Sequence, residues 1–227
     1  MKNENIIAPV NFYPKYEFAD DPKKPANVYL KGQETPVWIQ QRWTEGEFSK
    51  FVQENGCGHC CVAMAAKLHG VDIDPHREFE LCCTLWGMPD LQKKYGYMTV
   101  AGVAKILNHL GIPAIAKGTA EQGTKAASED ICLALKEGKM AIMISVPKRY
   151  PDNPFSPGGH YILAVGYTED GRILIANSTI RAKDLAIQFA SFDMIERALP
   201  ENTYANPALT WGEPAVQSEC YGYVIVG

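Results

Sequence analysis

The chain has 227 residues, of which 46% are hydrophobic and 21% are charged, and its formal net charge is −4 at pH 7. This length and composition predict a soluble globular protein with one large or two small domains and a sizeable core. The slightly acidic balance and the lack of a basic run argue against a nucleic-acid partner, and no apolar stretch is long enough for membrane insertion.

The seven cysteines are an odd number in a chain that is too long to need disulfides for its stability. Reduced thiols are therefore expected rather than a disulfide framework. The opening residues, "MKNENIIAPVNFYPK", contain no basic region followed by an apolar stretch, so we expect no signal peptide and a cytoplasmic protein. A leader removed from this sequence would reverse that expectation.

The first part of the chain is rich in proline and charge. Residues 1–35 show neither helical nor strand periodicity and predict an extended arm that wraps the rest of the molecule. The segment "PVWIQQRW" at 36–43 predicts a short strand that enters a loop. It opens the single main domain expected over 36–227.

Helical patterns dominate the next hundred residues, which predicts a helical lobe at about 44–138. Apolar residues recur at helical spacing after Gly56, after Asp74-Pro75 and after Thr99, the last of these an expected N-cap. A fourth helix is predicted over 128–138, capped by Ser128.

Strand patterns follow, which predicts a sheet lobe over about 139–227. Four apolar runs are rich in β-branched and aromatic residues, and "TEDG" between the second and third indicates a hairpin turn. Because the predicted helices come first along the chain and the strands follow, we expect an α+β fold with an antiparallel sheet. The four runs are 140–146, 161–167, 172–177 and 221–226.

The segment "GCGHCCVAM" at 56–64 holds three cysteines within five positions and allows three interpretations. As Cys-Gly-His-Cys it matches the dithiol of thiol-disulfide oxidoreductases, but that chemistry needs a preceding buried strand and an opposing proline, for which only Pro113 is available. As a metal site it lacks a second ligand pair of the usual spacing, so no metal or other cofactor is expected. Cys61, Cys82 and Cys83 lie on apolar stripes and are better explained as core residues than as metal ligands.

The third interpretation is a nucleophile. Cys57 lies in the first turn of the predicted helix, where unpaired N–H groups and the helix dipole lower the pKa of a thiol. The flanking glycines allow a sharp turn and close approach of a substrate, whereas Cys61 falls on the buried stripe and Cys60 on the flank.

A base for that nucleophile must come from elsewhere in the chain. Four of the five histidines lie in or beside helical segments, where a solvated or capping role is the default, whereas His160 opens an apolar strand after "SPGG". Asn177 ends the next strand, and antiparallel pairing would bring its side-chain oxygen to the imidazole. The four other histidines are His59, His69, His76 and His109.

These motifs, "GCGHCCVAMAAKLHG", "MTVAGVAKIL" and "GGHYILAVGY…ILIANS", resemble the papain-like cysteine peptidases. The similarity is greatest to free-standing relatives of the bacteriocin-processing peptidases that cleave double-glycine leaders, and it covers about residues 36–180. The resemblance implies a two-lobed fold, a peptide or protein substrate, and a catalytic triad of Cys57, His160 and Asn177.

The resemblance also implies an oxyanion-binding glutamine upstream of the cysteine. "PVWIQ" is similar to the family's segment and places this residue at Gln40, with Gln41 and Gln53 as competitors. The chain departs from the family at His59 and Cys60, where a proline and a small hydroxyl residue are common. The substrate, the choice between hydrolysis and acyl transfer, and a catalytically inactive peptide-binding role all stay open.

Overall fold

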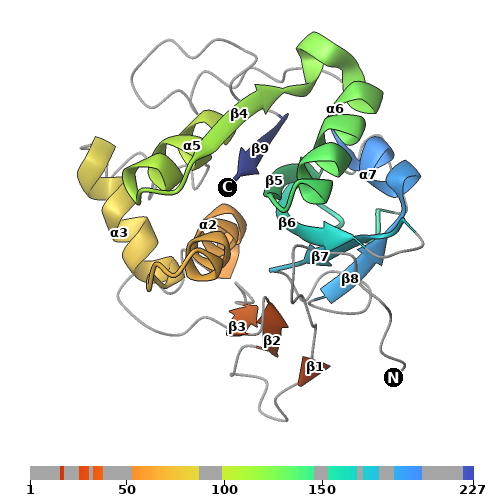
Figure 1. The fold of residues 1–227 in the computed structure, drawn as a ribbon. Coiled ribbons are helices and arrows are strands. Elements are labelled where there is room, and N and C mark those ends of the chain that lie inside the picture. The colour runs from red at the N-terminus through yellow and green to blue at the C-terminus, as the bar shows by residue number, and fades with distance from the viewer. Residues whose placement is uncertain are drawn as a thin grey trace.

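The computed structural model describes residues 16–17, 26–30, 33–37, 53–86, 99–145, 153–167, 171–178, 187–200 and 222–227. It is a mixed α+β structure in which N-terminal helices pack on a six-stranded antiparallel sheet (Figure 1). The α+β class expected from the sequence is therefore confirmed. No helix within the described ranges combines the length and the apolar character that a membrane crossing requires.

The larger sheet has the strand order β4-β9-β5-β6-β7-β8, and each neighbouring pair is antiparallel. The sequence patterns did not predict strands β4 and β8, because both strands are short and carry polar residues. The bounds are β4 Ala114–Gly118, β5 Met140–Ser145, β6 His160–Tyr167, β7 Ile173–Ala176, β8 Ile187–Ala190 and β9 Gly222–Val226.

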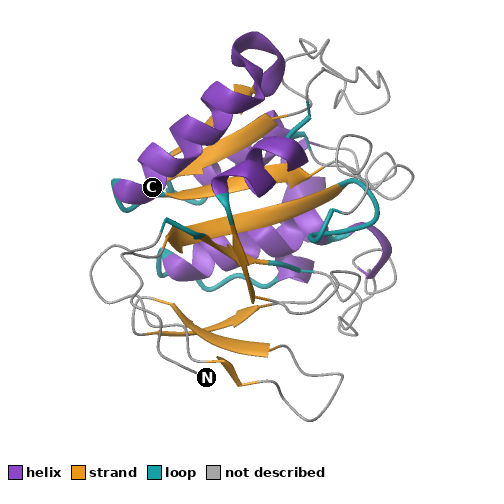
Figure 2. Cartoon of the chain, turned by 90° about the vertical axis from the view of Figure 1, so that its right-hand side faces the viewer, coloured by secondary structure: helices purple, strands orange, loops and turns teal. Residues whose placement is uncertain are grey.

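Helices cover both faces of this sheet, as Figure 2 shows. Because side chains alternate along a strand, Ile142 and Leu163 pack into the core beneath α2 (Cys57–Leu68) and α5 (Val100–His109). Met143 and Ile162 face the opposite way. They pack into a second core beneath α6 (Thr119–Lys136) and α7 (Phe192–Ala198). The central strands are therefore apolar on both faces.

The helix boundaries largely follow the sequence signals. Thr99 caps α5 by accepting a hydrogen bond from the Gly102 backbone N–H at 2.9 Å, as expected. The prediction for 128–138 was wrong at its start, because Ser128 donates to the Thr124 carbonyl instead of capping. The helix there begins at Thr119 and is interrupted at Gly123, whose φ of 80° is non-helical. The remaining helix, α3, spans Pro75–Trp86.

The N-terminal region differs from the expected arm without strands. It forms a three-stranded antiparallel sheet in the order β1-β2-β3, with β1 at Tyr16–Glu17, β2 at Ala26–Leu30 and β3 at Gln33–Val37. The strand expected over 36–43 is thus the end of β3, and its remaining residues lie outside the described ranges. β3 lies against α2, on the side away from the larger sheet (Figure 1).

Candidate active site

Cys57 is the first residue of α2, as the sequence predicted. The Cys60 N–H bonds to the Gly56 carbonyl at 2.8 Å and closes the first helical turn behind the thiol. Gly56 has no side chain that could cap the helix. The backbone N–H groups of the first turn therefore donate to no capping side chain. The Cys57 thiol is free and half-buried.

The Cys57 sulfur lies against the backbone of Tyr161, the residue that follows His160 in β6. Burial raises the pKa of the Cys57 thiol above its ordinary value of 9.0, and hydrogen bonds from the Tyr161 and Gly58 backbone oppose this rise. The sequence predicted a lowered pKa from the helix terminus alone. Desolvation outweighs that effect, because a thiolate is costly where water is excluded.

The best candidate for that base is His160, the first residue of β6. Its Nε2 lies 2.7 Å from the Asn177 Oδ1, and both side chains are buried. Asn177 donates its Nδ2–H to the Phe155 carbonyl at 3.0 Å. Since a carbonyl can only accept, the Asn177 amide has one possible orientation, and its oxygen must receive the proton of His160 Nε2. In the neutral imidazole the basic nitrogen is therefore Nδ1.

The loop before His160 is held by a second buried asparagine. Asn153 donates to the Ser145 hydroxyl on β5 at 2.6 Å and accepts from the Phe155 N–H at 2.9 Å. These bonds fix the carbonyl of Phe155 that orients Asn177. The sequence did not reveal this role of Asn153 and Phe155, because it depends on the pairing of β5 with β6.

The structure thus brings three predicted residues into one region: Asn177 bonds to His160, and Cys57 contacts the next residue along β6. Their catalytic roles stay predictions. Gln40 and Gln41, the first two candidates for the oxyanion donor, lie outside the described residues. Gln53 lies in a helical turn just before Gly56 and is half-buried.

The neighbouring cysteines have a different environment. Cys60 and Cys61 are fully buried, and burial raises the pKa of both thiols well above 9.0. The expectation that Cys60 lies on the flank of the helix was wrong, because α2 is enclosed on nearly all sides by the sheet and by its neighbouring helices and strands. The residues just before the motif, 53–55, are helical rather than a strand, and Pro113 is exposed.

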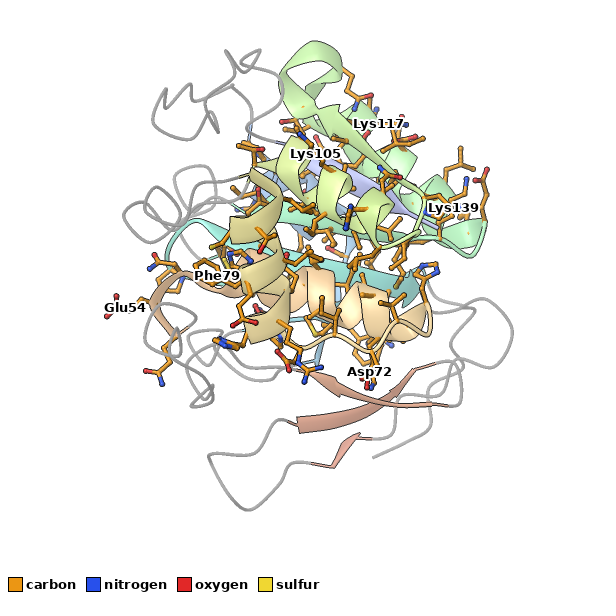
Figure 3. The ribbon with its side chains drawn as sticks, turned by 90° about the vertical axis from the view of Figure 1, so that its left-hand side faces the viewer. Glu54, Asp72, Phe79, Lys105, Lys117 and Lys139 are labelled. Carbon is orange, nitrogen blue, oxygen red and sulfur yellow. The ribbon has the colours of Figure 1, made fainter. Side chains whose placement is uncertain are left out.

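His59 is also fully buried, contrary to the expected solvated or capping position. Its Nδ1 bonds to Oε2 of Glu78 on α3, and its ring meets the Phe79 ring edge-on at a centroid distance of 5.2 Å. Figure 3 shows Phe79 on α3 beside α2. The sequence gave no signal for the role of Glu78, because its partner lies 19 residues away on another helix.

No protein-family model and no curated protein sequence matches this chain. The case for a function therefore depends on the residues themselves. A buried imidazole held by an amide lies on the strand whose next residue contacts a thiol at a helix terminus. These groups are the parts required for nucleophilic attack on a carbonyl.

Proposed function

We propose that this chain is a cysteine peptidase, or a related amide-bond hydrolase or acyltransferase, with a papain-like arrangement of its helical and sheet lobes. The single observation that carries the proposal is the buried hydrogen bond between His160 and Asn177, on the strand whose next residue, Tyr161, contacts the thiol of Cys57. The second bond from Asn177 to Phe155 supports it, because it leaves only Nδ1 of the neutral imidazole as a base.

The reaction begins with the protonated thiol that burial favours. His160 Nδ1 accepts the thiol proton while the sulfur attacks the substrate carbonyl, and the resulting imidazolium donates its Nε2–H to the Asn177 oxygen. The tetrahedral intermediate then collapses. Its C–N bond breaks, His160 returns the proton to the leaving amine, and the acyl group stays on Cys57 as a thioester.

Water or another nucleophile then attacks the thioester and releases the free enzyme. His160 takes the proton of the attacking group and returns it to the Cys57 sulfur. Hydrolysis and acyl transfer share every step except this one, so the triad supports both. The backbone N–H of Cys57 and the amide of Gln40 are the proposed oxyanion donors, and loss of one such donor typically costs ~10²–10³ in turnover.

The substrate proposed is a peptide or protein, and the cytoplasm is the proposed compartment. Five cysteines in the described ranges are free thiols, which supports a reducing environment; they are Cys57, Cys60, Cys61, Cys82 and Cys132. The second candidate, a thiol-disulfide oxidoreductase, needs Cys60 as a partner for Cys57. The buried position of Cys60 makes it a poor thiolate and favours the peptidase.

A peptide library tests the proposal. The full chain should generate new peptide termini that are absent with Cys57→Ala and present with Cys60→Ala. If Cys60→Ala abolishes activity as completely as Cys57→Ala, and the chain instead reduces disulfides, the oxidoreductase is the correct interpretation. If the library is untouched and no electrophile modifies Cys57, the chain is an inactive member of the fold.

A further inference from the structure

Three side chains that commonly bind metals converge between α2 and α3, away from the proposed triad. The Nδ1 of His59 faces Oε2 of Glu78, and the Cys82 thiol donates to Oε1 of Glu78 at 3.2 Å. One ligand atom from each residue lies within 4.8 Å of the other two, and all three side chains are completely buried. The cluster therefore joins the helix that carries Cys57 to the helix beside it.

The chemistry of these donors points to zinc. Imidazole nitrogen, thiolate sulfur and carboxylate oxygen bind Zn²⁺ at about 2.0–2.3 Å, which places tetrahedral ligands about 3.3–3.8 Å from one another. The donor atoms of the three residues lie within 4.8 Å of one another, which is close to that spacing. A thiolate excludes magnesium and calcium, which take oxygen ligands.

The charges in the cluster favour the same conclusion. A carboxylate in a fully buried position needs a compensating positive charge or full hydrogen bonding. In the structure the His59 ring nitrogen and the Cys82 thiol are the hydrogen-bond partners of this carboxylate. A divalent cation held by a neutral imidazole, a thiolate and a carboxylate would form a cluster with no net charge.

We propose that His59, Glu78 and Cys82 form a buried zinc site that ties α2 to α3. The site does not depend on the proposed peptidase activity, because none of its three ligands belongs to the triad. Its ligands hold the helix that presents Cys57 and are expected to stabilise the fold.

Cobalt is the appropriate spectroscopic probe, because tetrahedral thiolate coordination gives it a strong charge-transfer absorption. The full chain carrying Cys57→Ala is treated with a chelator, dialysed and titrated with Co²⁺, so that the thiol of the proposed active site cannot contribute. One equivalent should bind with the charge-transfer band. Adding Cys82→Ser should abolish the band and weaken zinc binding, measured by competition, by more than about 100-fold.

Cys83→Ser is the matched control, because Cys83 is the next residue of α3, is half-buried and lies outside the cluster. It should keep the band and the affinity. In case Cys82→Ser fails to fold, Glu78→Gln gives a second test. Zinc should raise the melting temperature of the parent and of Cys83→Ser, but not that of Glu78→Gln.

The proposal is overturned if the parent chain shows no charge-transfer band or no stabilisation by zinc. It is equally overturned if Cys83→Ser loses as much affinity as Cys82→Ser. In either case the three residues form a hydrogen-bonded core cluster without a metal.

Discussion

Asn177→Ala perturbs the proposed base without touching the nucleophile. The change removes the acceptor that lies 2.7 Å from His160 Nε2 and frees the ring to adopt the other tautomer. A hydrogen bond to a charged group contributes about 1.5–3 kcal/mol, and Asn177 bonds to the imidazolium formed during attack. At about 1.4 kcal/mol for each factor of ten, its loss should slow the reaction of Cys57 by about 10- to 150-fold.

The assay is alkylation of Cys57 by iodoacetamide at neutral pH, followed by peptide mass spectrometry. Asn108→Ala is the control, because the Asn108 amide also makes several hydrogen bonds, but to the backbone of Ala104 and Ala114 instead of to the proposed triad. It should lower the stability of the fold and leave the alkylation rate within about threefold of the parent, a change worth under 1 kcal/mol. The reasoning is refuted if Asn177→Ala reacts at the parental rate, or if Asn108→Ala slows the reaction equally.

Three further predictions concern the base, the buried thiols and the sheet. In His160→Ala, alkylation of Cys57 should require pH values above 9.0, because burial raises the pKa of this thiol and no imidazole remains to accept its proton; a rate–pH profile measures this. Burial raises the pKa of Cys61 well above 9.0, so this thiol ionises on unfolding at alkaline pH. The unfolding free energy from urea titrations should therefore fall as pH rises beyond 9.0, and Cys61→Ala should reduce the slope by about 1.4 kcal/mol per pH unit. Gly222→Ala would place a Cβ 2.0 Å from the Lys117 carbonyl oxygen, so thermal unfolding should reveal a loss of about 1–3 kcal/mol or more; an unchanged melting temperature would contradict the pairing of β4 with β9.

Local signals were sufficient for the parts of the fold that depend on short-range periodicity. The start of α2 at Cys57 follows from Gly56 and the spacing of small apolar residues, and the start of α5 follows from the Thr99 cap. The closeness of His160 and Asn177 could also be predicted. Two consecutive antiparallel strands bring such positions to the same end of a sheet.

Long-range packing explains what the sequence could not show. His59 and Cys60 lie near the start of α2, and nothing local indicates that the sheet and the elements around α2 bury both side chains. The raised pKa of the Cys57 thiol has the same origin, because desolvation depends on what the fold packs around the sulfur. The orientation of Asn177 required Phe155, whose position depends on the pairing of β5 with β6.

The central claim is that Cys57 carries the acyl group during the reaction. The most direct measurement is to mix the full chain with peptide substrates, quench in acid, and map any acyl adduct by mass spectrometry. The account predicts a hydroxylamine-sensitive thioester on Cys57, at lower occupancy in His160→Ala and absent from Cys57→Ala. An adduct on Cys60 in the parent chain, or a reversible disulfide between Cys57 and Cys60 with no acyl adduct, would contradict it.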